Sequence, residues 1–495
     1  MKRLAVSLAL SRKSRPEELL LVERNKKLRS FGGVLAFPGG KLDADDESIP
    51  VRGLTHKTEA MGRFMAAGAR ELFEETGIWL ARGGNTPEIS KLREDRRRLL
   101  AEDVAFSTLL ERNEQHLQAE DLVPLCRITT PPFAPVLFDT WFLRGLVPDD
   151  TEVEIWDGEL VDGDFVDPET TLTRWKNGEL KIAPPMIVLL EEWANGQDAL
   201  GERIRAITES YEAGNLHRIY FSPGILLVPL QTPTRPPATH TNTCIVGEER
   251  LYLVDPSPVD EREQARLWDL VDDLRTEGRT LEGILLTHYH PDHVGALAAM
   301  QARYGVAAYA HADCIAELPD AHFAPPLGHG DTIELDRAPD GSAGWKLEAY
   351  HVPGHARGHL AFRDSRYGAV IAGDLVSTVS SILVDPKDGH LATYLKSLEL
   401  LESVTTGTLY PGHGPPVPDG KKVIRKTLEH RAEREQQLVA ALSKEPQSAG
   451  ALVAAIYKDV PSKMLALAER SLLSGLVKLE EEGRVERSEA GYSLV

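Results

Sequence analysis

The sequence predicts a multidomain chain that combines α/β and α+β architecture. At 495 residues it exceeds the size at which a single hydrophobic core usually stops growing, roughly 250–300 residues, so two or three domains are expected. The pattern of strand-like and helix-like segments changes twice along the sequence, which predicts domains over residues 1–214, 215–418 and 419–495. In the middle region short apolar strands alternate with helical patterns, and this alternation is typical of layered α/β folds.

Charge and cysteine content narrow the classes of function. The net charge of −20 argues against a large surface for general nucleic-acid binding, although a local basic patch is compatible with it. Cys126, Cys244 and Cys314 form no CxxC pair, which excludes a disulfide scaffold and a thiolate zinc finger and fits a reducing compartment. The opening MKRLAVSLAL predicts a strand rather than a signal peptide, and no apolar run approaches the ~20 residues of a membrane span. We therefore expect a cytoplasmic protein without a membrane partner. The sequence leaves its oligomeric state open.

The first region contains strand-like runs and one strong helical segment, MGRFMAAGARELFEETGI. On a helix Glu71, Glu74 and Glu75 share one face, because positions three and four apart are neighbours. Three carboxylates on one face repel each other unless a hard cation such as Mg²⁺ or Mn²⁺ binds between them. The alternative is an ordinary solvent-exposed, glutamate-rich helix face.

The middle region carries a dense group of metal-ligand residues in LLTHYHPDHVGA. After a buried strand, His288 and His290 can face one ion while Asp292 and His293 face another, and imidazole with carboxylate suits zinc or a similar divalent metal. One such histidine would be an ordinary loop residue, but an HxHxDH cluster rarely is. Further residues of this type end three later apolar runs, and these are His355, Asp374 and His413.

The last region is mostly helical and charged, and it ends in a pattern of two short helices and a hairpin. A basic run follows the His413 loop and contains Lys421, Lys422, Arg425, Lys426, Arg431 and Arg434. Such a run is able to contact phosphates, or it is a solvated helix face. No aromatic-rich platform for base stacking accompanies it.

These ligand residues, at these spacings, resemble the metallo-β-lactamase superfamily across roughly residues 215–418. The resemblance implies an αββα sandwich with two Zn²⁺ or other divalent ions at one sheet edge. His288, His290 and His355 would hold the first ion, Asp292, His293 and His413 the second, and Asp374 would bridge them, with Asp255 in support. Two such ions lower the pKa of a shared water, so hydrolysis is the expected chemistry. Asp292 and His359 are the expected catalytic residues, and for His359 a supporting hydrogen-bonding role is the alternative.

Two C-terminal segments resemble the β-lactamase-like protein 2 group. The first runs from YLKSLELLESVTTGTLYPGHGPPV into EHRAEREQQLVAAL, and the second is the final segment from ALVAAIYKDV onward, which resembles that group's winged-helix end. The resemblance implies endoribonuclease activity on single-stranded RNA. A glyoxalase-II-like thioester or ester hydrolase is the alternative, because it shares the glycine–histidine pattern of Gly354–His359.

The segment ARELFEETGI resembles the Nudix box, with Arg70, Glu71, Leu72, Glu74, Glu75, Gly77 and Ile78 in register. The resemblance implies an α/β/α sandwich in which Glu71, Glu74, Glu75 and the Gly40 carbonyl bind Mg²⁺ or Mn²⁺. Glu71 would be catalytic in cleaving a diphosphate, and Glu159 is a further candidate carboxylate. The box departs from the family pattern, because a long insertion precedes Arg70 and no glutamate sits seven residues before it to help hold the loop.

That insertion resembles the coenzyme A diphosphatase subgroup of Nudix proteins, and RNKKLRSFGGVLAFPGG resembles the coenzyme A-associated signature. Coenzyme A or its acyl esters are therefore the first expected substrates of this domain, and nucleoside diphosphate derivatives the second. The alternative is a non-catalytic sensor of a nucleotide-like ligand, in a regulator whose winged helix binds DNA.

Overall fold

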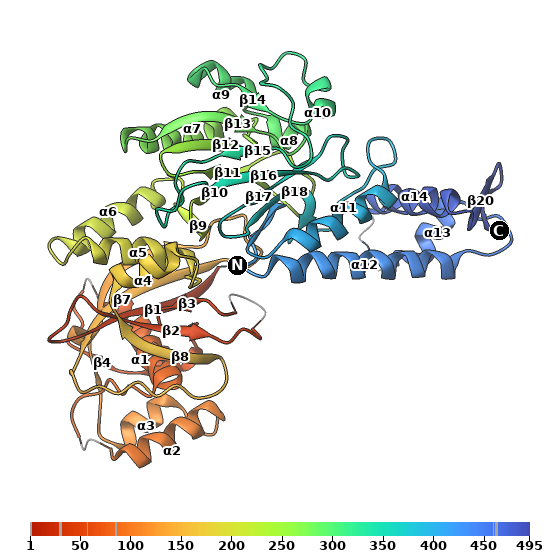
Figure 1. Cartoon of the computed structure of the whole chain (residues 1–495). Coiled ribbons are helices and arrows are strands. Elements are labelled where there is room, and N and C mark those ends of the chain that lie inside the picture. Colours follow the sequence, from red (N-terminus) through yellow and green to blue (C-terminus); the bar gives the residue numbers. More distant parts are fainter. Residues whose placement is uncertain (1, 29–31, 57, 85–86, 459, 461–463) are drawn as a thin grey trace. The chain divides into compact units, whose positions relative to one another are not determined.

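The computed structural model describes residues 2–28, 32–56, 58–84, 87–458, 460 and 464–495. The chain divides into two compact units, Met1–Phe221 and Ser222–Val495, and each is described here by itself (Figure 1). The predicted boundary at residue 418 lies within the second unit, and it remains a prediction. None of the helices in the described part of the chain combines the length and the apolar character that a membrane span requires.

The first unit contains two three-stranded sheets (Figure 1). In one, β7 is the central strand, parallel to β1 and antiparallel to β6. In the other, β2 lies between β3 and β8, and both pairings are antiparallel. The strands are β1 (Arg3–Arg12), β2 (Leu19–Arg24), β3 (Leu35–Ala36), β4 (Val51–Arg52), β5 (Leu117–Gln118), β6 (Val123–Thr129), β7 (Phe138–Val147) and β8 (Leu160–Val166).

Helix α1 (Gly62–Thr76) is buried on two sides, which leaves one narrow polar stripe. Phe64, Met65 and Leu72 pack in a cluster with β1, whereas Ala69 and Phe73 pack with the helices that follow α1. The helix ends at Gly77, whose positive φ of 73° is the conformation that favours glycine at a helix C-terminus. The other helices are η1 (Ala44–Ser48), η2 (Glu59–Met61), α2 (Ile89–Leu100), α3 (Phe106–Arg112), η3 (Ala119–Asp121), α4 (Pro168–Lys176), α5 (Pro184–Ala194) and α6 (Leu200–Glu212).

The second unit is built on a six-stranded and a five-stranded sheet, with helices on their outer sides (Figure 1). The strand orders are β14-β13-β12-β11-β10-β9 and β15-β16-β17-β18-β19. Within the second unit the first sheet comprises β10 (Ile225–Gln231), β11 (His240–Val246), β12 (Arg250–Val254), β13 (Thr280–Leu285) and β14 (Ala308–Tyr309), and its edge strand β9 (Ile219–Ser222) spans the boundary at residue 221. The second comprises β15 (Thr332–Glu334), β16 (Lys346–His351), β17 (Leu360–Asp364), β18 (Val370–Ser377) and β19 (Leu409–His413).

Buried strands explain why the apolar runs of this unit are continuous rather than alternating. Six of the seven residues of β10 are buried, as are seven of the eight residues of β18, and strands covered on both faces read as unbroken apolar runs. On the outside of the five-stranded sheet, α11 and α12 contribute Tyr394, Leu398 and Ile424 to a core with β18. The helices are α7 (Glu261–Thr276), α8 (Pro291–Val294), α9 (Leu297–Tyr304), α10 (Ala312–Ala316), α11 (Leu391–Val404) and α12 (Gly420–Ala441).

The C-terminal end consists of two helices and a hairpin, as the sequence pattern predicts. These are α13 (Ala449–Ile456), α14 (Leu465–Glu481), β20 (Val485–Ser488) and β21 (Gly491–Leu494). Leu438 and Leu442 at the end of α12 pack into the same small core as Leu472 and Leu476 of α14. The C-terminal end is therefore joined to the rest of the second unit by a shared hydrophobic core.

Candidate metal centre

The HxHxDH segment leaves the buried end of β13 as a tight loop. His288 is 0% exposed, and His290 is the residue before α8, whose first position is Pro291. Proline is favoured at the first position of a helix, since its missing N–H would have no partner there. The short helix then presents Asp292 and His293 one turn away from the two loop histidines.

His288, His290 and His355 form a first cluster of three ring nitrogens. His290 Nδ1 lies 3.0 Å from His288 Nε2 and 3.1 Å from His355 Nε2. The three rings are nearly perpendicular to one another, with interplanar angles of 80°, 82° and 87°. A tetrahedral zinc ion with Zn–N distances of 2.0–2.1 Å separates its ligand nitrogens by about 3.3–3.4 Å. The spacing and the diverging rings fit a single divalent ion.

Asp292, His293 and His413 form a second cluster, and Asp374 lies between the two. Asp374 Oδ1 is 3.2 Å from His413 Nε2 and 3.4 Å from His293 Nε2, and Asp292 Oδ2 is 3.6 Å from His413 Nε2. The other oxygen, Asp374 Oδ2, is 3.5 Å from His355 Nε2 of the first cluster. The structure therefore brings all seven predicted ligand residues together, with Asp374 placed to serve both clusters.

The electrostatics of these residues fit a divalent ion. His293 Nε2 and Asp374 Oδ1 are buried and have no hydrogen-bond partner among the residues that the structure describes. Burial, and then the neighbouring histidines, hold the pKa of His288 well below its usual range, and burial lowers the pKa of His355 to about 4. Burial opposes ionisation of Asp374, but His413 and His293 hold the pKa of this carboxyl well below its usual range. Neutral imidazoles and an ionised carboxylate are the forms that bind metal, and these directions favour them at His288, His355 and Asp374. Burial lowers the pKa of His293 and His413, but Asp374 raises both above the usual value, so these two rings would release a proton when a metal binds.

Asp255 and His359 lie behind the clusters. The Asp255 carboxylate accepts hydrogen bonds from the Thr287 N–H at 2.7 Å, the Thr287 hydroxyl at 2.6 Å and His293 Nδ1 at 2.8 Å, so it orients a ligand ring. His359 is 0% exposed, and its Nε2 accepts the Asp374 N–H at 3.2 Å. Of the two roles expected for His359, this geometry favours support of Asp374 over contact with substrate.

In the first unit, two of the three glutamates of α1 contact the Gly39–Gly40 turn. Glu75 Oε2 accepts the Gly39 N–H at 2.8 Å, and a Cβ on Gly40 would lie 2.4 Å from the Glu71 carboxylate. Burial raises the pKa of Glu71 to about 7 and that of Glu75 to about 8, and it also raises the pKa of Glu74. Crowded, buried carboxylates of this kind suit a hard cation.

The Arg70 guanidinium occupies part of this space. Arg70 NH1 lies 3.1 Å from Glu71 Oε1 and 3.3 Å from Glu74 Oε2. Groups of three ligand-type side chains with donor atoms within 4.8 Å of one another occur, among the described residues, in the second unit only. The donor atoms of Glu71, Glu74 and Glu75 are therefore not as close to one another as those of the histidine clusters. Glu159 pairs with Arg24 at 2.7 Å and contributes to the raised pKa of Glu75.

The glutamate that the sequence lacks before Arg70 has a substitute in Asp46. Asp46 is 0% exposed and accepts two hydrogen bonds from Arg70, from Nε at 2.9 Å and NH2 at 3.0 Å. Asp46 lies near the start of the insertion, shortly after Gly40 and 24 residues before Arg70. Sequence reasoning missed it by searching a set distance before Arg70. A search forward from Gly40 would have found it.

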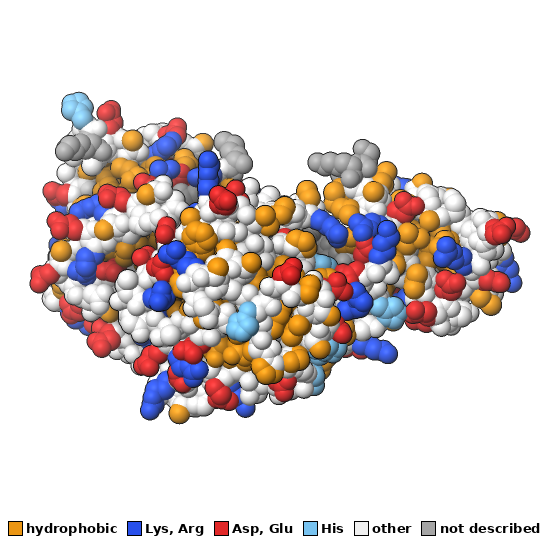
Figure 2. All heavy atoms as spheres, turned by 90° about the horizontal axis from the view of Figure 1, so that it is seen from above, with side chains coloured by type: hydrophobic (Ala, Val, Ile, Leu, Met, Phe, Trp, Pro, Cys, Tyr) orange, Lys and Arg blue, Asp and Glu red, His pale blue; other side chains and the backbone are white. Residues whose placement is uncertain are grey.

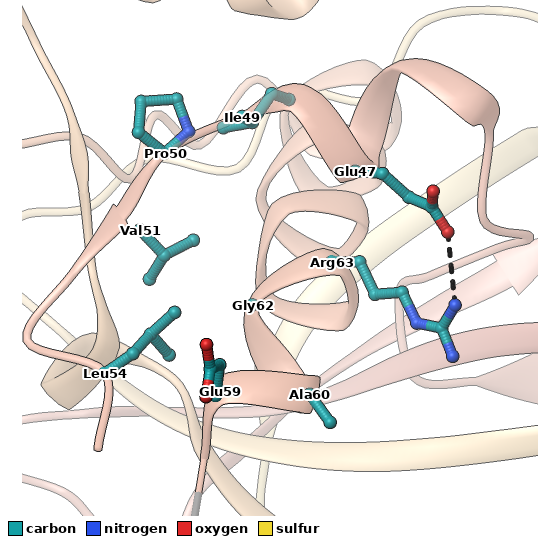
Figure 3. Close-up of a pocket in the computed structure, with 9 residues that line it drawn as sticks. All are labelled: Glu47, Ile49, Pro50, Val51, Leu54, Glu59, Ala60, Gly62 and Arg63. Atoms are coloured by element: carbon teal, nitrogen blue, oxygen red, sulfur yellow. Dashed lines mark hydrogen bonds and ion pairs between the residues drawn. The ribbon is translucent and has the colours of Figure 1, made fainter. Parts of the chain in front are cut away.

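The insertion forms a pocket of about 540 Å³ in the first unit (Figure 3). Its lining includes Glu47, Glu59 and Arg63, and Arg63 is paired with Glu47 at 3.1 Å. Two carboxylates and an arginine that is already paired do not suit a diphosphate. The coenzyme A-like stretch Arg24–Gly40 includes residues 29–31, which lie outside the described residues.

Comparison with known proteins identifies the second unit. Residues 236–413 match the sequence model of the Metallo-beta-lactamase superfamily, and residues 448–492 match that of the Beta-lactamase associated winged helix domain. Residues 236–413 form a metallo-β-lactamase superfamily domain. The chain therefore carries a hydrolase domain of this superfamily in its second unit. The matched segment includes all seven candidate metal ligands, and its last residue is His413.

Relatives of this domain match about half of the chain. Beta-lactamase-like protein 2 homolog of Drosophila melanogaster is 28% identical over 263 residues, which are 50% of this chain and 85% of that protein. An atrochrysone carboxyl ACP thioesterase of Aspergillus aculeatus is 29% identical over 224 residues, which are 45% of this chain and 66% of that protein. A NUDIX hydrolase structure from Alicyclobacillus acidocaldarius covers 40% of this chain and 96% of its own, with 27% identity and a TM-score of 0.36.

Beside the metallo-β-lactamase centre, basic and hydroxyl side chains line a pocket of about 320 Å³. It begins at the end of β18, where the Thr378 N–H donates to the His413 carbonyl at 3.1 Å. Burial lowers the pKa of His430 most, and the neighbouring Arg434 and Arg431 lower it further. The pocket is lined by Ser377, Thr378, Ser380, Ser381, Ile382, Val423, Lys426, Thr427, His430 and Arg431.

The predicted basic run on α12 is divided between structural and exposed positions. Arg425 pairs with Glu402 at 2.7 Å, and Arg431 donates to the Ile382 carbonyl. Lys421, Lys422 and Lys426 are exposed. On the face drawn in Figure 2, blue and red side chains are interspersed. Positive charge near the metallo-β-lactamase centre is therefore confined to a small area, where Lys426 and Arg431 line the pocket.

A further group, His311, Asp313 and His351, has donor atoms within 4.8 Å of one another. The rings of His311 and His351 stack 4.0 Å apart at an interplanar angle of 7°. Rings that bind one tetrahedral ion diverge from it, as the rings of the first cluster do. We therefore assign no metal to this group.

Proposed function

We propose that the second unit is a two-metal hydrolase whose substrate carries an anionic group next to the bond that is cut. The observation behind this proposal is the pair of clusters joined by Asp374. His288, His290 and His355 would hold one ion, and Asp292, His293 and His413 the other. Divalent ions bound there would polarise the scissile bond and lower the pKa of water.

The chain's own groups order this site before any ion binds. Asp255 holds His293 by its Nδ1, so that Nε2 faces Asp374. The fully buried His359 accepts the Asp374 N–H and so sets the backbone from which the bridging carboxylate projects. Such outer hydrogen bonds determine the tautomer and direction of ligand rings, which supports a site organised in advance.

A thioester or ester is the substrate class that we propose first. Relatives with half-chain matches are named thioesterases, and Lys426, His430 and Arg431 provide cationic and polar groups for a phosphate or carboxylate of the substrate. Single-stranded RNA is the second candidate. It is supported by the similarity to a beta-lactamase-like protein 2 homologue and by the same pocket, which would receive a backbone phosphate.

For the first unit we propose cleavage of a diphosphate, with coenzyme A first and nucleoside diphosphate derivatives second. Glu71, Glu74, Glu75 and the Gly40 carbonyl would hold Mg²⁺ or Mn²⁺, and Asp46 supplies the acidic partner for Arg70 that the box otherwise lacks. A non-catalytic ligand sensor is the alternative, in line with the Arg70 guanidinium between Glu71 and Glu74. With a thioesterase in the second unit, the chain would degrade an acyl-coenzyme A in two steps.

The full chain, loaded with Zn²⁺, is the protein to test. We expect it to release free thiol from a short-chain acyl-coenzyme A, and to lose this activity when a chelator removes the metal. End-labelled single-stranded RNA is the parallel substrate. Cleavage of RNA with no thiol release would move RNA to first place, and inertness toward both would reject the proposal. Mg²⁺-dependent formation of phosphopantetheine from coenzyme A tests the first unit separately.

Replacing Lys426 with alanine should raise KM about tenfold and leave kcat nearly unchanged. A charged hydrogen bond is worth about 1.5–3 kcal/mol, and 1.4 kcal/mol corresponds to a factor of ten in binding. Lys422→Ala is the matched control, because Lys422 is exposed on the same helix but does not line the pocket. Equal KM values for the two variants would remove the pocket from the proposed substrate site.

A further inference from the structure

A loop between β18 and α11 contacts two of the three histidines of the first cluster. We call residues Ile382–His390 the bracing loop. Asp388 Oδ2 lies 2.8 Å from His290 Nε2, and the Leu383 carbonyl accepts a hydrogen bond from His355 Nδ1 at 3.0 Å. The nitrogens that contact the loop, His290 Nε2 and His355 Nδ1, point away from the cluster. The other nitrogens of the two rings, His290 Nδ1 and His355 Nε2, face each other within it. The loop therefore sets the tautomer and the direction of both rings.

The bracing loop packs closely against the segment that carries His355. The His390 N–H donates to the Gly354 carbonyl at 2.7 Å, and a Cβ on Gly389 would lie 2.5 Å from the same oxygen. On the other side, the Tyr289 hydroxyl donates to the second oxygen of Asp388. Asp388 thus connects two neighbouring residues of the HxHxDH loop to the bracing loop, and a shift of that loop would move His290 with it.

The far side of the bracing loop is held by α14. Ser474, which is buried, donates to the Val384 carbonyl at 2.6 Å, and Arg470 pairs with Asp385. Further along the helix, Glu481 Oε2 lies 2.8 Å from His390 Nε2. Positions 470, 474 and 481 are four and seven residues apart, so one face of α14 makes all three contacts.

We propose that the bracing loop and α14 together position His290 and His355, so that the C-terminal end of the chain is part of the framework of the metal centre. This inference rests on the proposed metal-binding function of the second unit. Asp388 contacts His290 at its outer nitrogen, and Arg470, Ser474 and Glu481 reach the clusters only through the bracing loop, so all four are positioning residues. The C-terminal end then has a role at the metal centre besides any contact that it makes with a macromolecule.

The affinity of the full chain for Zn²⁺, measured by competition with a chromogenic chelator, tests this inference without reference to activity. Asp388→Ala should weaken binding about 10–100-fold, the usual cost of losing a hydrogen-bond partner of a ligand histidine. Ser474→Ala and Glu481→Gln should weaken it about threefold to tenfold, the range of one lost hydrogen bond. The absorption spectrum of the Co²⁺-loaded protein should change in Asp388→Ala, because the coordination geometry at His290 changes.

Glu480 provides the matched control, because Glu480 and Glu481 are adjacent and both exposed. Glu480→Gln should bind Zn²⁺ as the wild type does, whereas Glu481→Gln should not. Thermal melting of the metal-free variants, recorded in parallel, identifies any variant that fails to fold. If Asp388→Ala or Ser474→Ala fails to fold, the comparison of Glu481→Gln with Glu480→Gln still tests the inference, because both glutamates are exposed. Wild-type affinity in both Asp388→Ala and Glu481→Gln would overturn the inference. A wild-type chain that binds no Zn²⁺ would instead overturn the proposed function.

Discussion

Asp374→Asn should lower hydrolysis by the second unit about 1000-fold and reduce its metal content from two ions per chain toward one. The side chain is 11% exposed, and both of its oxygens face imidazole nitrogens. Asparagine has the same size, but it lacks the charge and presents an NH₂ group that repels a cation. Removing the charged partner from a buried group costs about 3–5 kcal/mol, which corresponds to roughly 10²–10⁴ in rate. Elemental analysis after dialysis and a thiol-release assay would measure the two effects.

Gly412→Ala should have a similar effect while leaving Asp374 chemically intact. A Cβ at this position would lie 2.2 Å from Asp374 Oδ1, a distance that no side chain tolerates. The bridging carboxylate would have to turn away from His413 and His293. Gly450→Ala is the control, because a Cβ on Gly450 meets nothing within 4 Å. Retention of two ions by both Asp374→Asn and Gly412→Ala would refute the bridging role of Asp374.

The grouping of the candidate metal ligands could be predicted from the sequence because these residues follow local rules. His288, His290, Asp292 and His293 lie within six residues, and a strand end followed by a turn brings them to one edge. Asp374 and His413 follow from the same rule, because β18 and β19 are parallel neighbours and their carboxyl ends meet at one edge. Buried parallel strands appear in the sequence as continuous apolar runs, so the residue at which each run stops predicts the end of the strand.

The partners that hold the ligand rings from outside could not be predicted in this way. Asp388 follows His290 by 98 residues, within a loop that has no periodic pattern, and Ser474 reaches the loop from a helix 90 residues further along the chain. These contacts exist only after tertiary packing. The Asp46 case is different, because there the residue type was recognisable but the insertion places it 24 residues before Arg70 instead of seven. Surface insertions cost little free energy, so loop spacing is a poor guide.

Asp46→Ala should destabilise the first unit by about 3 kcal/mol, at the lower end of the cost of breaking a buried ion pair. Arg70, which is 6% exposed, would keep Glu71 and Glu74 at 3.1 and 3.3 Å but lose both hydrogen bonds to Asp46. For a unit of this size, 3 kcal/mol lowers the melting temperature by roughly 6–12 °C. Hydrogen exchange of α1 in the full chain would assign the change to this unit. Asp45→Ala is the control, because Asp45 is exposed beside it, and equal protection of α1 in the two variants would contradict the prediction.

A double variant separates the ion pair from simple loss of packing. Asp46→Leu with Arg70→Met removes both charges, whereas either change alone leaves one buried charge without its main partner. The cost of a buried pair arises largely from the unpaired partner, so the double variant should lose clearly less stability than the sum of the two single changes. A strictly additive loss would mean that Arg70 and Asp46 act independently. In that case the other contacts of Arg70, to Lys41, Glu71 and Glu74, would account for the order of this turn without Asp46.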